Sequence, residues 1–206
     1  MRDDGIKTIR AGGEPQSSGP ANLTAPSNAL ESFAASIRSP NLKAVAAHWV
    51  QAKGTKAMPS WEQLSPARIA PQLPQIWAYR YNWELDKFSG RLAGEKIRQI
   101  FGKNIHGLSL DEIFPANAVG WTHHLFHRVV QEPALYRSTG RIFSHLNRWG
   151  IGERIILPLS SDGIEGDGIL GATCYHYSHP STLGETGMET ETEQWFCLRP
   201  ERFGAD

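Results

Sequence analysis

Three histidines within one heptapeptide are the first candidates for holding a metal ion or a haem iron. His123, His124 and His127 lie in the segment Trp121–His127. On a helix that turns by about 100° per residue, His124 and His127 project away from the apolar face and His123 lies at its edge, whereas Thr122 lies near the centre of that face. The i and i+3 pair could chelate a surface metal ion, but a nearby third ligand is missing. The spacing favours a solvated helix face over an iron site in the core.

The two cysteines do not have the spacing of a metal site. Cys174 and Cys197 fit no zinc-binding pattern, and a disulfide between them is left open, with reduced thiols the expectation. The chain has no GxSxG, HExxH, P-loop or GxGxxG motif and no defensible His–Asp–Ser pattern. We therefore expect no catalytic residues, no metal site and no enzymatic activity.

Four arginines on expected strands are candidates for binding an anion. They are Arg91, Arg137, Arg141 and Arg154. Arginines in such places usually cover a sheet face with their aliphatic stems instead. The sequence does not distinguish between these two roles for any of the four.

The elements that position these side chains follow from hydrophobic periodicity and from Gly and Pro breaks. Alternating apolar residues predict strands over Leu73–Glu84, from Phe88, and over Leu135–Leu146, Ile151–Ser160 and Gly168–Tyr177. A helical segment that ends in a helix over Ala116–Gln131 separates the second strand from the third. Segregated helices and strands predict the α+β class, with a five-stranded antiparallel sheet and N-terminal cap helices.

The helix expected over Pro40–Lys53 carries one continuous apolar stripe. Its members are spaced at i, i+3, i+4, i+7 and i+8 and are Leu42, Val45, Ala46, Trp49 and Val50. The stripe covers the chain's own sheet, or it also pairs with a second subunit. Four aromatic residues, Tyr81, Trp83, Tyr136 and Tyr175, are expected on the outer sheet face. Because one helix would not cover that face, we expect a homodimer.

Three sequence blocks carry a resemblance to a known family. They are RLAGEKIRQIFGKNIHGLSLDEIF from Arg91 to Phe114, GTKAMPSWEQLSPARIAPQL from Gly54 to Leu73, and ERIILPLSSDGIEGDGILG from Glu153 to Gly171. Together they resemble a family of short, mostly alphaproteobacterial PAS-like sensor proteins, over roughly residues 42–177. The resemblance implies a PAS-like fold and a sensory role. It implies no established ligand, cofactor or catalytic residue.

The PAS-like fold would place a ligand pocket between the sheet and the helix over Ala116–Gln131. The side chains expected to line it are Leu92, Phe101, Trp121, His123, Phe126, Ile142 and Leu157. A flavin-photosensing PAS domain carries its reactive cysteine in the helical middle, and this chain has no cysteine before Cys174. That photochemistry is therefore excluded, and the cofactor stays unknown.

Length and composition bound the organisation. The chain has 206 residues with 21 basic and 21 acidic side chains, so no net charge favours nucleic acid or an anionic membrane. No apolar run approaches the roughly 18–20 residues of a membrane span, and no secretory signal is evident, so a cytoplasmic location is expected. We expect a flexible tail over 1–27, a helical cap over 28–72, a PAS-like core over 73–178 and a flexible tail over 179–206, whose apolar patch Gln194–Leu198 is left unplaced.

Two functions fit these expectations. The first is a stand-alone sensory or regulatory module without an output domain, which acts by contact with a second copy or with a separate signalling protein. The alternative is a receptor for a small molecule, such as haem or a metabolite, in which occupancy of the pocket is the central event. A fold alone does not decide between them.

Overall fold

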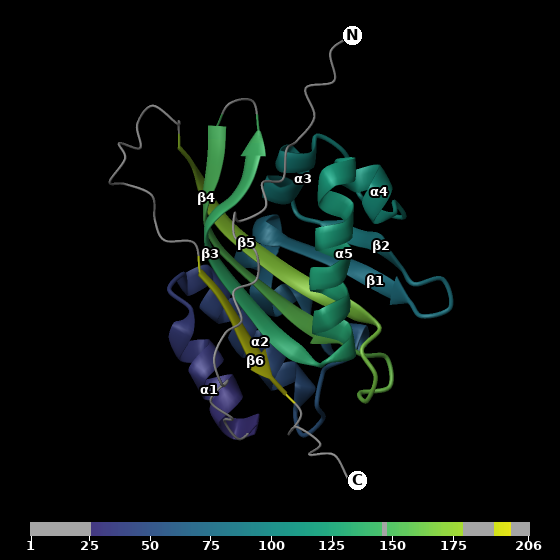
Figure 1. The fold of residues 1–206 in the computed structure, drawn as a ribbon. Helices are drawn as coiled ribbons and strands as arrows, with labels where there is room; N and C mark the ends of the chain where they lie inside the picture. Colours follow the sequence, from purple (N-terminus) through teal and green to yellow (C-terminus); the bar gives the residue numbers. More distant parts are fainter. Residues whose placement is uncertain (1–25, 146–147, 179–191, 199–206) are drawn as a thin grey trace, which may run out of the picture.

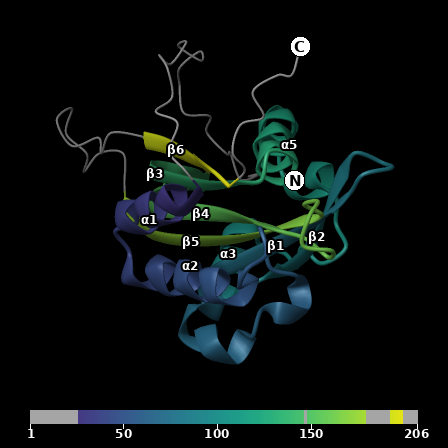
Figure 2. The ribbon, with the colours of Figure 1, turned by 90° about the horizontal axis from the view of Figure 1, so that it is seen from below.

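The computed structural model describes residues 26–145, 148–178 and 192–198, which form one antiparallel sheet with helices on both faces (Figures 1 and 2). The helices are α1 (Pro26–Ser36), α2 (Pro40–Lys53), α3 (Glu95–Phe101), α4 (Leu110–Ile113) and α5 (Ala116–Gln131), with 3-10 helices η1 (Trp61–Gln63) and η2 (Pro66–Gln75). The strands are β1 (Ile76–Asn82), β2 (Lys87–Ala93), β3 (Ala134–His145), β4 (Arg148–Leu159), β5 (Gly168–Ser178) and β6 (Thr192–Cys197).

The sheet has six strands in the order β2-β1-β5-β4-β3-β6, one more than the sequence predicts. The additional strand, β6, pairs antiparallel with β3 and contains most of the apolar patch Gln194–Leu198. Its alternation explains the pairing, because Trp195 packs against Tyr136 on one face of the sheet and Phe196 packs against Phe33 on the other. A patch that the sequence leaves unplaced is therefore part of the sheet.

Helices α3, α4 and α5 connect β2 to β3. Their buried residues belong to the core on one sheet face, which we call the front face, and α5 lies over that face in Figure 2. Local sequence signals mark the ends of the two short helices. Gly102 adopts a left-handed conformation with φ of 65° and ends α3. Ser109 and Glu112 form a capping box that begins α4. The chain thus leaves the sheet after β2, makes two short helices and returns through the long helix α5.

Helices α1, α2 and η2 cover the opposite, back face of the sheet (Figure 2). Most of the α2 stripe packs inside the chain: Trp49 has no exposed surface, and its indole N–H donates a hydrogen bond of 2.9 Å to the carbonyl oxygen of Pro158. The aromatic residues expected on this outer face include Tyr81, Tyr136 and Tyr175, but all three belong to the front-face core. The chain itself buries four of the five stripe residues, whereas Val50 is 38% exposed, so the stripe no longer supports the packing argument for a homodimer through α2.

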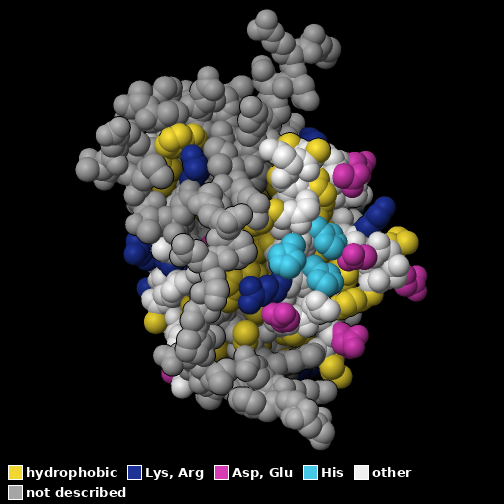
Figure 3. Space-filling model, viewed as in Figure 1, with side chains coloured by type: hydrophobic (Ala, Val, Ile, Leu, Met, Phe, Trp, Pro, Cys, Tyr) yellow, Lys and Arg dark blue, Asp and Glu magenta, His cyan; other side chains and the backbone are white. Residues whose placement is uncertain are grey.

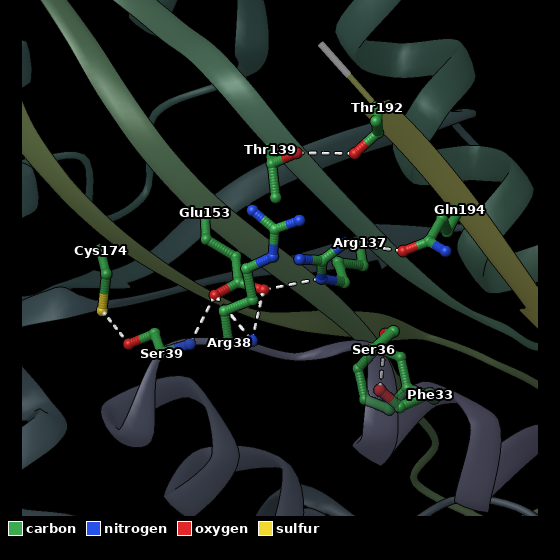
Figure 4. A network of polar contacts seen from close by, with 10 residues as sticks. All are labelled: Phe33, Ser36, Arg38, Ser39, Arg137, Thr139, Glu153, Cys174, Thr192 and Gln194. Carbon is green, nitrogen blue, oxygen red and sulfur yellow. Dashed lines mark hydrogen bonds and ion pairs between the residues drawn. The ribbon is translucent and has the colours of Figure 1, made fainter. Parts of the chain in front are cut away.

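A buried ion pair fastens the α1–α2 junction to the back face (Figure 4). The Arg137 Nε donates to the Glu153 carboxylate at 2.6 Å, and both side chains are less than a tenth exposed. The same carboxylate accepts hydrogen bonds from the backbone N–H groups of Arg38 and Ser39, where the two helices meet. A further Arg137 nitrogen donates to the Gln194 side chain of β6. One carboxylate on β4 thus holds the helical cap in place.

The expected tails fall mostly outside the described residues. Residues 1–25, 179–191 and 199–206 are not described, whereas Pro26 already begins α1. Cys174 and Cys197 are both free thiols, so the disulfide that the sequence leaves open is not formed. Among the described helices, none has the length and apolar character that crossing a membrane requires.

Candidate ligand cavity

A cavity of about 40 Å³ lies in the front-face core, between the sheet and helices α3 and α5. The rest of its wall comes from strands β1, β3, β4 and β5 and from Phe114, which directly follows α4. The lining is mostly aromatic and aliphatic, and consists of Trp77, Tyr79, Ile97, Ile100, Phe101, Phe114, Trp121, Thr122, Leu125, Phe126, Ile142, Phe143, Arg154 and Thr173. A concave, apolar space with a few polar groups is the usual form of a ligand site.

Aromatic rings from β1 and α5 form one side of the cavity. The Trp77 and Phe126 rings stack with centroids 5.4 Å apart, and Tyr79 lies 5.1 Å from Phe126. Trp77 can lie flat on β5 because residue 171 is a glycine: a Cβ atom there would come within 2.2 Å of the indole ring. The indole N–H then donates to the Thr173 hydroxyl at 2.9 Å. These contacts fix the ring that floors the cavity.

Short helices close the other side of the cavity. Ile97 and Ile100 from α3 are buried there, and Phe101 meets Phe114 edge-to-face with centroids 5.4 Å apart. Helix α3 has only 7 residues and ends at Gly102. This wall therefore consists of a short element and an aromatic pair, whereas the opposite wall consists of the sheet.

Three residues of the cavity lining each carry a buried polar atom without a hydrogen-bond partner among the described residues. These atoms are the Tyr79 hydroxyl, the Thr122 hydroxyl and the Nε of Arg154. Tyr79 and Thr122 are 1% and 2% exposed, so bulk water does not solvate them. Leaving such an atom unpaired costs about 1–3 kcal/mol, and more for a charged group. A partner that completes the hydrogen bond of such an atom, whether an ordered water molecule or a ligand, offsets this cost.

The electrostatics of the wall are dominated by Arg154. Burial lowers the pKa of its guanidinium, and the neighbouring Tyr136, Tyr79 and Glu193 oppose that shift. Burial likewise raises the pKa of the Tyr79 hydroxyl, so Tyr79 is neutral at pH 7. The guanidinium also lies over the Trp77 ring, 6.0 Å from its centroid. The cavity wall therefore carries one positive charge and no negative one.

The other strand arginines all have evident roles in packing. Arg137 pairs with Glu153, Arg91 lies over the Trp61 ring at 4.4 Å, and Arg141 lies over the Trp149 ring at 4.9 Å. Arg154 alone of the four lines the cavity. Arg154 therefore remains the candidate for binding an anion, a distinction among the four arginines that the sequence does not make.

Four of the seven residues predicted to line a pocket do line this cavity. They are Phe101, Trp121, Phe126 and Ile142. Leu157 is fully buried but packs on the back face, because Ile156 occupies the front-facing position beside it. Leu92 lies on the edge strand β2 and is 40% exposed. The pocket prediction is corrected at these two positions.

The third correction concerns His123, which faces the β1–β2 hairpin and not the cavity. Its Nε2 lies 3.1 Å from the Asp86 carboxylate, and its ring packs edge-to-face on Phe88. Histidine side chains gather on the surface over α5 (Figure 3), where His124 is exposed, as the helical wheel predicts. No histidine lines the cavity, and no metal-binding cluster of His, Cys, Asp or Glu occurs among the described residues. The arrangement offers no axial ligand for a haem iron inside the core.

Sequence reasoning missed several residues of the wall. Trp77 and Tyr79 carry an alternation signal but no hint of which face of the sheet they occupy. Thr122 was placed near the centre of the apolar face of α5, and a polar residue in that position is the one signal that could have marked it. Such a residue is exceptional in a core, since buried polar groups need partners.

An antiparallel sheet with the inner order β2-β1-β5-β4-β3 and a helical segment between β2 and β3 defines the fold of a PAS sensor domain. A family model described as a PAS domain matches residues 37–174, which is most of the chain. The chain therefore belongs to the PAS domain family. No curated protein and no solved structure matches it. PAS domains are in general sensory modules without catalytic activity, and the α+β class predicted from the sequence is confirmed.

Proposed function

We propose that this chain is a sensory module in which a small molecule in the front-face cavity is the signal. The observation that carries the proposal is the set of three unpaired polar atoms around one apolar space, from Tyr79, Thr122 and Arg154. A core that served only to pack would gain stability if those positions were apolar. Their presence in the core is explained when a bound molecule completes their hydrogen bonds.

The size of the cavity restricts the signal to molecules smaller than haem or a flavin. A volume of about 40 Å³ is well below the roughly 300–1,000 Å³ of pockets for drug-sized ligands. It exceeds what one water molecule needs. The cavity therefore suits a ligand with only a few heavy atoms, and this size favours a small metabolite over a prosthetic group.

The response is a change of contact with a second copy of the chain or with a separate signalling protein. This part of the proposal is supported by the family, because PAS domains are sensory modules that commonly dimerise. It does not rest on α2, because four of its five stripe residues are buried inside the chain. Light scattering with and without ligand separates the two kinds of partner: a change in mass without any added protein identifies the second copy.

A cavity-filling substitution tests whether the cavity is a ligand site. Thr122→Ile puts an ethyl group where the hydroxyl lies, and Leu157→Met, a volume-conserving change on the back face, is the matched control. Native mass spectrometry of protein isolated from its own host should show a small bound mass for the unchanged chain and the control. Thr122→Ile should lack that mass. The proposal fails if no bound mass is found and no small-molecule panel raises the melting temperature of the unchanged chain.

A further inference from the structure

We propose that the molecule in the front-face cavity is a small monocarboxylate. Its carboxylate binds Arg154, Tyr79 and Thr122, and its carbon chain packs against the apolar wall. This inference rests on the proposed function, because it names the chemical class of the ligand for the same cavity. It follows from the donors, the charge and the size of the cavity.

The unpaired polar atoms of the wall match the acceptors of a carboxylate. A guanidinium has only donors, and the Tyr79 and Thr122 hydroxyls can each donate an O–H. The Thr173 hydroxyl oxygen already accepts the Trp77 N–H, so its own O–H is also left to donate. An ionised carboxylate has acceptors only and pairs with a guanidinium through two parallel hydrogen bonds.

The charge of the wall favours an anion with a single negative charge. Arg154 is the one charged side chain in the lining, and no described acidic residue forms an ion pair with it. Glu193 of β6 acts on Arg154 only through its longer-range field, and its side chain is exposed. A doubly charged phosphate would bring more charge and more acceptors than one guanidinium and a few hydroxyls satisfy. A single carboxylate leaves the charges balanced.

The remainder of the wall favours an aliphatic chain. Ile97, Ile100, Leu125 and Ile142 present no polar atoms, and the aromatic side chains add only the indole N–H groups of Trp77 and Trp121 and the Tyr79 hydroxyl. A volume of about 40 Å³ holds about three or four non-hydrogen atoms of an unperturbed ligand, at about 10–15 Å³ for each water-sized group, so acetate and propionate fit it best. The expected ligand thus has one charged end and a short apolar tail, because the cavity has one charged group and an apolar wall.

Titration calorimetry of the full chain at pH 7 tests this class with three matched series: straight-chain carboxylates of acetate to hexanoate, their primary amides and the corresponding amines. Carboxylates should bind, amides should bind at least about tenfold more weakly, and amines should not bind. Arg154→Gln should weaken carboxylate binding by about 10- to 100-fold, and Arg154→Lys, which keeps the charge without the fork, by less. Arg80→Gln removes an exposed positive charge from β1 and should leave binding unchanged.

Tyr79→Phe and Thr122→Val provide the same test if Arg154→Gln does not fold, because each removes one donor and nearly preserves volume. Each substitution should weaken the binding of carboxylates by about 3- to 10-fold and should weaken the binding of amides less. Equal binding of carboxylates and amides, unchanged by Arg154→Gln or by both hydroxyl deletions, would overturn the carboxylate assignment and leave the proposed cavity function intact. Absence of binding in every series overturns the carboxylate assignment. The proposed function is then tested separately, by comparing the bound mass in native mass spectra of the unchanged chain and of Thr122→Ile.

Discussion

Replacing Thr122 by valine should make the ligand-free protein more stable. The two side chains have nearly the same shape, so the change removes one hydroxyl and leaves the cavity wall otherwise intact. Thr122 is 2% exposed, and its hydroxyl has no partner among the described residues. Replacing a buried polar residue usually lowers the stability of a protein. Here we expect the opposite, because the Thr122 hydroxyl has no hydrogen bond with the described residues to lose.

The size of the gain follows from the desolvation of one unpaired hydroxyl. Leaving a buried polar group without a partner costs about 1–3 kcal/mol, and threonine and valine have similar helix propensities. The adjacent cavity of about 40 Å³ can admit a water molecule that relieves part of this cost. We therefore expect Thr122→Val to raise the free energy of unfolding by about 1 kcal/mol, which corresponds to about 2–4 °C in melting temperature for a domain of this size.

Urea unfolding followed by circular dichroism measures this change, and Thr173→Val is the matched control. Thr173 lines the same cavity and is also 2% exposed, but its hydroxyl accepts the Trp77 indole N–H at 2.9 Å. Removing that acceptor leaves a buried N–H unpaired and should lower the free energy of unfolding by about 1–3 kcal/mol. The same substitution is thus expected to raise the free energy of unfolding at Thr122 and to lower it at Thr173.

The reasoning is refuted if both substitutions lower the free energy of unfolding. If Thr122→Val lowers the free energy of unfolding as much as Thr173→Val does, the Thr122 hydroxyl is paired in solution, and the inference of an unfilled polar site fails at that atom. A constant slope of unfolding free energy against urea is needed for the comparison, because a change in that slope would mean that the unfolded or native state itself had changed.

Three further predictions test the core and the helical cap. Phe126→Ala should lower the free energy of unfolding by about 3–5 kcal/mol, because Phe126 is 3% exposed between the sheet and α5; urea unfolding measures it. Trp49→Glu should unfold the chain and not merely separate two subunits, since the indole is fully buried; far-ultraviolet circular dichroism distinguishes the two. Burial, and then Arg68, lower the pKa of His48 below 6.5, so its contribution to stability is complete above pH 6.5 and is lost as the pH falls through the lowered pKa. His48→Gln should reduce this loss in unfolding measured from pH 7 to pH 4, because the neutral ring accepts the Ser65 backbone N–H.

Contrary results have clear meanings. A loss well under 1 kcal/mol for Phe126→Ala would mean that α5 presents a different face to the sheet. A monomeric, folded Trp49→Glu variant from a dimeric parent would restore the self-association argument. An identical pH dependence with and without His48 would show that carboxylate protonation accounts for the acid branch.

Much of the fold could be predicted because local signals agree with it. Glycines at 94 and 102, the Ser109 cap and the proline beyond α4 each mark a real boundary. The sixth strand could not be predicted, because β6 is short and depends on pairing with β3, which is distant in sequence. Pairing between distant segments is decided by tertiary contacts, which a local pattern does not contain.

The face of β4 could not be predicted either. Ile155, Ile156 and Leu157 are all fully buried, because helices cover both sides of the sheet. When both faces are buried, apolar residues occur at successive positions and alternation no longer tells inside from outside. Alternation therefore does not reveal that Leu157 packs on the back face. The polar residues of the same strand, Glu153 and Arg154, lie on the back and front faces respectively.

Arg137 and Arg154 show what a sequence leaves undetermined about a buried charge. The two residues are of one type and lie on neighbouring strands, yet Arg137 has a carboxylate at 2.6 Å and Arg154 has none in ion-pair range among the described residues. Removing one partner of a buried pair is strongly destabilising, so the Glu153 pair is explained by the structure of the free protein. The same reasoning leaves Arg154 unexplained in the free protein, since its Nε is buried without an acceptor. Because Glu153 and Arg154 are consecutive on β4, the carboxylate that holds the α1–α2 junction and the arginine of the cavity lining share one strand and face opposite sides of the sheet.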